Sequence, residues 1–107
     1  MRGETLKGHL DLLLLAVLAG GPAHGYAIIT ALKDRSSGVF DLPEGTIYPA
    51  LHRLERAGLL DSHWALAAGR SRRIYELSPA GREALRTQRD DWQRFARAIH
   101  AVVQGSA

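Results

Sequence analysis

The sequence predicts a mainly α-helical fold with a small β-hairpin, arranged as a winged helix-turn-helix that ends in a long helix. Three observations predict it. Residues 45–58 have the periodicity of a helix with one aliphatic face and one aromatic, cationic face. Two runs rich in aromatic and aliphatic residues, 59–65 and 72–77, flank a turn-forming glycine. Ser78-Pro79 is a typical helix start, and the helical pattern after it continues to Gln104.

Length and composition limit what the chain can be. Its 107 residues are enough for one small domain, in which we expect 1–77 to form the winged helix-turn-helix and 78–107 a C-terminal dimerisation helix. The formal net charge is only +3, so the placement of the cations matters more than their number. The chain has no cysteine, which excludes disulfides and thiol catalysis and favours a cytoplasmic location. The longest apolar stretch, residues 12–19, is shorter than the ~20 residues that span a bilayer, and Asp11 interrupts any signal-peptide core.

The first helix is expected from about Thr5 to Ala19, ending at the Gly20-Gly21-Pro22 stop signal. Its apolar side chains surround the axis almost completely: Leu10, Leu12, Leu13, Leu14, Leu15, Val17 and Leu18. A helix that is apolar on all sides must be buried on all sides. Because a small domain covers only one of those sides, the pattern predicts a second molecule on the other.

The second and third helices follow. The second is expected from about His24 to Arg35, with Tyr26, Ile29 and Leu32 facing inward. In the third, Pro49 has no amide hydrogen, so we expect that helix to begin near Gly45 or Thr46 and to hold Pro49 in its first turn.

The two faces of the third helix differ in chemistry. The arc expected to be buried consists of Ile47, Ala50, Leu51 and Leu54. The opposite arc consists of Gly45, Tyr48, Pro49, His52, Arg53 and Arg56, with Glu55 at its margin. A helix that shows water an aromatic and cationic face suits an anionic partner, and double-stranded DNA is the obvious candidate.

The hairpin adds a second cationic element. Its tip is expected within residues 66–71, around Gly69, so Arg70, Arg72 and Arg73 lie at or near that tip. In a winged helix the third helix enters the major groove, while the wing contacts phosphates or reaches a minor groove. Arginine suits this role because its planar, permanently charged fork matches phosphate and guanine edges. Trp64 is expected to cover the wing and the third helix.

The C-terminal helix carries an apolar stripe. It is expected over residues 79–104, roughly 39 Å long. Leu85, Trp92 and Ile99 recur every seven residues, with Phe95 and Val102 beside the last two. Trp92 and Phe95 have no obvious partner within the small domain, which again predicts a homodimer. Trp92 is expected to serve dimer packing, a ligand platform, or both.

Catalytic and metal-binding patterns are missing. The sequence has no nucleophile elbow, no phosphate-binding glycine loop and no HExxH motif, so we expect neither an enzyme nor a cofactor. Asp90 and Asp91 point about 100° apart on a helix and are expected to be solvated. No single element has metal-ligand spacing in its histidines, so no metal site is assigned. The five histidines are His9, His24, His52, His63 and His100.

Several segments together resemble the PadR family of bacterial transcriptional regulators. They are His24–Ile28, Gly45–Leu51, Arg53–Glu55, Gly58–Leu60, Gly69–Tyr75 and Ser78–Gly81. The resemblance covers roughly residues 8–85, and the short C-terminal region resembles the subfamily with one long dimerisation helix. It implies a homodimer that binds a palindromic operator, usually as a repressor.

The resemblance also implies roles for particular residues. It assigns a DNA-backbone contact to Tyr48 and places the start of the third helix near the bases. Together with the cationic residues, the expected DNA contacts are Gly45, Thr46, Tyr48, Pro49, His52, Arg53, Arg70, Arg72 and Arg73. Glu44 stands where many members have a small polar residue, so docking near that position is expected to differ.

Some relatives are released from DNA by phenolic acids or flat cationic drugs bound at the dimer centre. The resemblance therefore implies a small aromatic effector site at the dimer interface, formed by Leu10, Leu14, Trp92, Phe95 and Ile99. Two alternatives stay open. One is a winged-helix adaptor that binds proteins and not DNA, and the other is a metal-responsive regulator.

Overall fold

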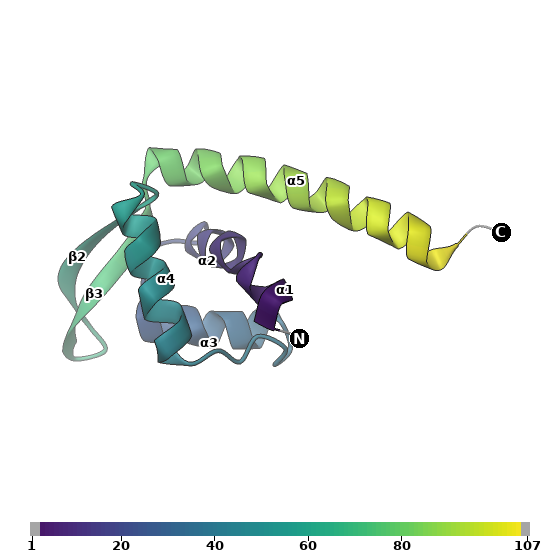
Figure 1. Ribbon diagram of the computed structural model, residues 1–107. Coiled ribbons are helices and arrows are strands. Elements are labelled where there is room, and N and C mark those ends of the chain that lie inside the picture. The colour runs from purple at the N-terminus through teal and green to yellow at the C-terminus, as the bar shows by residue number, and fades with distance from the viewer. Residues whose placement is uncertain (1–2, 106–107) are drawn as a thin grey trace.

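The computed structural model describes residues 3–105 and is a helical body with a β-hairpin at one end (Figure 1). The elements in chain order are α1 (Gly3–Lys7), α2 (Leu10–Leu18), β1 (Ala23–His24), α3 (Gly25–Arg35), α4 (Glu44–Arg56), β2 (Leu60–Ala67), β3 (Arg70–Leu77) and α5 (Pro79–Gln104). Helix α5 passes along the body and then extends well beyond it. The predicted fold class, mainly helical with a small hairpin and a long final helix, is confirmed.

The N-terminal segment forms two helices. The predicted single helix from Thr5 to Ala19 is wrong, because α1 ends at Lys7 and α2 starts at Leu10. Gly8 between them is a poor helix former. The ring Nδ1–H of His9 donates to the Thr5 carbonyl oxygen at 2.7 Å, which gives the first helix a partner for one of its last carbonyls.

Helix α2 is buried on one side only. Its core-facing residues are Leu10, Leu14, Leu15 and Leu18. Those on the other side are only half-buried: Leu12, Leu13, Ala16 and Val17. The chain therefore leaves one apolar side of α2 incompletely buried, as the all-round apolar pattern predicts.

Helix α3 turns a different face to the core than expected. The prediction that Tyr26 faces inward is wrong, because its side chain is 60% exposed. Ile29 is half-buried against the core. The buried arc is Gly25, Ile28 and Leu32. These positions recur at three and four residues, so they share one side of the helix and leave Tyr26 about 100° away from it.

Helix α4 begins one residue earlier than expected. The amides of Thr46 and Ile47 both donate to the Pro43 carbonyl oxygen, at 3.0 and 3.2 Å. Pro49 is thus the sixth residue of α4, and the prediction that it lies in the first turn is wrong. The proline leaves the Gly45 carbonyl without its helical donor, but Gly45 is exposed, so water can satisfy that oxygen. The predicted buried arc of this helix is confirmed: Ile47, Ala50, Leu51 and Leu54.

The sheet has three antiparallel strands in the order β1-β3-β2. The two-residue strand β1 is not predicted from the sequence; it pairs with Ile74 and Tyr75 of β3. The hairpin is tighter than the expected 66–71 tip, because Ala67 pairs with Arg70 across a two-residue turn. Both turn residues, Ala68 and Gly69, have positive φ (53° and 77°), as a turn that matches the strand twist requires.

The first turns of α5 join the body to the sheet. The Ser78 hydroxyl accepts from the Gly81 amide at 3.0 Å and donates to the Gly58 carbonyl oxygen at 2.7 Å. Gly81 lies so close to the loop before β2 that an added Cβ would be 2.0 Å from the Leu59 carbonyl oxygen. Leu85 is the last buried side chain of α5. The predicted helix over 79–104 is confirmed. None of the described helices is long and apolar enough to cross a membrane.

Candidate nucleic-acid interface

The outward face of α4 is open along its length. Its exposed residues are Gly45, Pro49, His52, Arg53 and Arg56, whereas Thr46 and Tyr48 are half-buried. Glu44 is exposed in the first turn, where its negative charge is favourable to the helix dipole. Among the side chains of residues 5–105, His52 and Arg56 have no ion-pair partner. The face therefore presents an imidazole and a guanidinium that are accessible to a ligand.

Tyr48 connects α4 to the start of α3. A Cβ added at Gly25 would lie 2.5 Å from atoms of the Tyr48 ring, so the absence of a side chain at position 25 makes room for that ring. The contact sets how closely α4 approaches α3. Tyr48 is thus a packing residue as well as a candidate for DNA contact.

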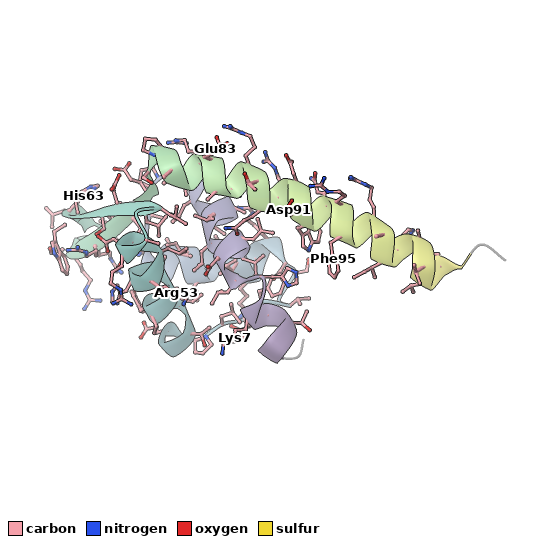
Figure 2. All side chains as sticks on the ribbon, turned by 45° about the horizontal axis from the view of Figure 1, so that its top comes forward. Lys7, Arg53, His63, Glu83, Asp91 and Phe95 are labelled. Atoms are coloured by element: carbon pink, nitrogen blue, oxygen red, sulfur yellow. The ribbon has the colours of Figure 1, made fainter. Side chains whose placement is uncertain are left out.

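Arg53 already has a partner within the chain. Its Nη2 pairs with Oδ1 of Asp11 on α2, and both side chains keep a large exposed fraction, 53% and 40%. Figure 2 labels Arg53 on α4. The pair holds the Arg53 guanidinium toward α2, so a phosphate has to share or replace the Asp11 carboxylate. An exposed pair of this kind is weak, on the order of 1 kcal/mol or less.

The sequence predicts that the three wing arginines lie together at or near the tip. In the structure they do not form one cluster. Side chains alternate along β3, so Arg70 and Arg72 share one face and Arg73 lies on the other. Arg70 is exposed next to the turn. The Nε–H of Arg72 donates to the Ala67 carbonyl oxygen at 3.0 Å. The prediction treats the tip as a loop. In the structure the pairing of β2 with β3 continues to Arg70, so successive side chains of β3 point to opposite faces of the sheet.

Arg73 faces α4. Its Nη2 lies 3.5 Å from Oε2 of Glu55, and its guanidinium carbon lies 5.6 Å from the centroid of the Trp64 ring. Trp64 is 64% exposed. The expectation that Trp64 covers the wing is therefore correct only for Arg73, and the ring is not part of the core.

Two titratable groups next to the wing have shifted pKa values. Burial and the charge of Arg72 lower the pKa of His24, whose Nδ1 accepts from the Ala27 amide at 3.3 Å and caps α3. Burial and the Glu55 carboxylate raise the pKa of Tyr75. His24 is therefore neutral and Tyr75 protonated at neutral pH.

A second candidate site is a groove of about 950 Å³ between α2 and α5. Its apolar lining includes Leu12, Leu13, Ala16, Phe40, Leu85 and Trp92. The prediction that Leu10 and Leu14 line this space is wrong, because they are 7% and 0% exposed and belong to the core. A helix that is apolar on all sides gives no signal of which leucines face inward. Phe95 borders a shallower pocket next to Trp92, and Ile99 lies further along α5, 45% exposed.

The histidines lie on separate elements. His52 is on α4, His63 on β2 and His100 on α5. Over residues 5–105, whose side chains the structure describes, no group of three or more His, Cys, Asp or Glu side chains is arranged to hold a metal ion.

Comparisons with known proteins agree on one family. The family described as "Transcriptional regulator PadR-like family" matches residues 14–87. The "Transcriptional regulator Rv3488" of Mycobacterium tuberculosis (strain ATCC 25618 / H37Rv) is 49% identical over 96 residues, covering 90% of this chain and 87% of that protein.

Solved structures have the same fold. The PadR-like transcriptional regulator (BC4206) from Bacillus cereus strain ATCC 14579 superposes with a TM-score of 0.86 at 25% identity, covering 97% of this chain and 100% of that one. A PadR family transcriptional regulator from Eggerthella lenta DSM 2243 superposes with a TM-score of 0.81 at 29% identity, covering 96% and 88%. The likeness extends over α5 as well as the winged helix.

Proposed function

This chain belongs to the PadR-like family of transcriptional regulators, and we propose that it represses transcription as a homodimer that binds a palindromic operator through α4 and the wing. The family consists of transcriptional regulators and not of enzymes, which confirms the prediction that the chain is not an enzyme. Its role as a transcriptional regulator, predicted from the sequence, is likewise confirmed.

The exposed face of α4 is the observation that carries the proposal for DNA. It shows solvent one imidazole and two guanidinium groups, from His52, Arg53 and Arg56. Helix α4 itself places no carboxylate at the centre of this face, although Asp11 of α2 pairs with Arg53. Gly45, at the start of the same face, is exposed and has no side chain, which lets the backbone approach a groove closely at that point. Glu55 of α4 contacts Arg73 and Ser62 of the wing, so the wing lies beside this helix. One duplex can therefore contact the helix and the wing together. Arg70 at the turn then supplies a phosphate contact.

The homodimer is supported by the unpaired part of α5. Trp92, Phe95 and Ile99 are 45–57% exposed although they are large and apolar. All three follow Leu85, the last buried side chain of α5, and this helix extends past the body of the domain (Figure 1). A second copy that lays its own α5 against this stripe removes the apolar surface from water.

The groove supports an effector, and its charges indicate the kind of effector. Arg35 and Arg89 border it, and among the side chains that the structure describes, residues 5–105, no Asp or Glu lines it. Trp92 supplies an aromatic wall. We therefore favour an aromatic carboxylate over a flat cation. The test is quenching of tryptophan emission by a phenolic acid, with the neutral methyl ester of the same acid as control. Equal quenching by both compounds would contradict the role of the two arginines.

DNA binding is tested with the region upstream of the protein's own gene. Fluorescence anisotropy should show tight binding that weakens steeply with salt, because phosphate contacts release counterions. Arg70→Ala should weaken binding and reduce the slope of log K against log salt by about 0.9. Arg97→Ala, an exposed arginine on α5, is the matched control and should leave both unchanged. Absence of binding to this region and to genomic fragments would instead favour the adaptor alternative.

A further inference from the structure

One carboxylate joins the end of α4 to both strands of the wing. Oε2 of Glu55 accepts a hydrogen bond from the Ser62 hydroxyl on β2. The same oxygen accepts from Nη2 of Arg73 on β3 at 3.5 Å. Three elements that are separate in the sequence thus meet at a single acceptor. We call Glu55, Ser62, Trp64 and Arg73 the Glu55 cluster.

Arg73 is engaged on two sides. Besides Glu55, its guanidinium lies 5.6 Å from the ring centroid of Trp64, its cross-strand partner. This is the distance of a cation–π contact. The side chains of Arg73 and Glu55 are 39% and 29% exposed, so the pair is partly shielded from water. Arg70 has no ion pair or cation–π contact with the side chains of residues 5–105, and it is exposed next to the turn.

The cluster rests on the core. Ser62 is directly opposite Tyr75 in the strand register, and Tyr75 is 1% exposed. Below it Leu60 pairs with Leu77, and both are buried. The base of the wing is therefore fixed by apolar packing. Above Tyr75 the Glu55 cluster supplies polar contacts between the wing and α4.

We propose that Glu55 and Arg73 are positioning residues, which set the angle of the wing against α4, and that Arg73 acts through Glu55 and not by contacting phosphate. This inference rests on the proposed function, in which α4 and the wing bind one duplex. The angle then determines whether the wing reaches the backbone while α4 occupies the groove. Under this proposal, Arg70 makes the direct phosphate contact of the wing.

The decisive variant is Glu55→Gln, because the two explanations predict opposite signs. If Glu55 were only a negative charge near DNA, its removal would raise the affinity for the upstream region. If it positions the wing, affinity falls, by about tenfold, since the bond from Arg73 loses its charged acceptor. Tighter binding of Glu55→Gln would overturn the proposal.

Arg73→Ala separates positioning from phosphate contact. Removing an arginine that binds phosphate lowers the salt slope by about 0.9, whereas removing a positioning residue lowers affinity and leaves the slope unchanged. The double variant Glu55→Gln/Arg73→Ala should bind about as weakly as either single variant, because both remove the same connection. A reduced slope for Arg73→Ala, or additive losses in the double variant, would contradict the proposal.

Two further measurements distinguish a folding defect in a variant from a failure of the wild type to bind DNA. Circular dichroism melting shows whether each variant folds, and Ser62→Ala is a milder variant that changes no charge and should weaken binding about twofold with an unchanged slope. In a Trp92→Phe background the remaining emission comes from Trp64, and Glu55→Gln should shift it in the free protein. If wild type binds no DNA, the proposed function fails. The Trp64 emission then still tests the cluster, and an unchanged spectrum overturns it.

Discussion

At two glycines, the absence of a side chain allows a neighbouring part of the chain to pack closely. Gly25 and Gly81 both lie where a Cβ would meet another atom, at 2.5 and 2.0 Å. The obstacles differ: the far end of the Tyr48 ring at Gly25, and the backbone oxygen of Leu59 at Gly81. A ring can swing away, but a backbone carbonyl moves only with the loop that carries it. The same substitution therefore has different consequences at the two glycines.

Gly81→Ala should destabilise the protein strongly. The new methyl group would overlap the Leu59 carbonyl and push α5 off the loop before β2, at a cost of about 2–3 kcal/mol. Urea unfolding measures the change. Gly45→Ala is the matched control, because Gly45 is exposed on α4 with nothing within 4 Å, and should be neutral or stabilising by up to about 1 kcal/mol. Equal stability of the Gly81→Ala variant and wild type would contradict the close packing of α5.

His24 should make stability depend on pH. Its pKa in the folded protein is lowered, by burial first and by Arg72 second, from an unfolded value of about 6.5. The folded state therefore binds fewer protons than the unfolded state, and stability falls as the pH drops from above 6.5 through the lowered pKa. Protonation also turns Nδ1 into a donor and removes the cap on the Ala27 amide.

The measurement compares urea unfolding at pH 7.5 and 5.5. His24→Asn keeps a capping side chain without a titratable group, so it should lose less stability on acidification than wild type. The His63→Asn variant, on the exposed face of β2, is the control and should behave as wild type. The same pH dependence in His24→Asn and wild type would show that other groups account for it.

At the scale of elements, the molecule depends on how helices begin and where they are tied. Helix α4 starts at Glu44 with no side-chain cap, and its position comes from packing and from Tyr48 against α3. Helix α5 starts with a side-chain cap that is also tied to the loop between α4 and β2. The orientation of the long helix therefore depends on its first turn.

Ser78→Ala should loosen that first turn. It removes the acceptor for the Gly81 amide and the donor to the Gly58 carbonyl at a site that is 6% exposed. The expected loss is about 2 kcal/mol of unfolding free energy, measured in urea. Ser71→Ala, exposed on β3, is the control and should stay within about 0.5 kcal/mol of wild type. A loss no larger than that of Ser71→Ala would contradict the double role of the hydroxyl.

The whole molecule is elongated, with principal extents of 58 × 28 × 21 Å, because α5 projects past the domain (Figure 1). The stripe of large apolar side chains on this projection is exposed in a single copy of the chain. It would be covered where two copies associate through it. In the proposed dimer, the two α4 helices are expected about 34 Å apart, which matches half-sites one turn of duplex apart.

Phe95→Glu should dissociate the proposed dimer. It places a charge in the middle of the apolar stripe, where association would bury it without a partner. Sedimentation at micromolar concentration measures the mass. Ala101→Glu adds the same charge on another side of α5 and should remain dimeric. A Phe95→Glu variant with the mass of wild type, or a monomeric wild type, would contradict the stripe as the interface.

Much of the local structure follows from the sequence alone. Helix stops, the Ser78-Pro79 start, the buried arc of α4 and the hairpin are set by neighbours within a few residues, which a pattern contains. The family resemblance is equally visible there, because the motifs at the start of α3, along α4 and in β3 are contiguous segments. The cationic face of α4 is predictable for the same reason.

The partner that each side chain meets is set by the packing of the whole chain. The pairing of Arg73 with Glu55 and of Arg53 with Asp11 joins residues far apart in the chain, so no local pattern distinguishes these arginines from Arg70. The buried sides of α2 and α3 are selected in the same way. A helix that is apolar all round, or one with Tyr26 two residues before Ile28, offers several possible inward faces, and the packing of the rest of the chain selects one.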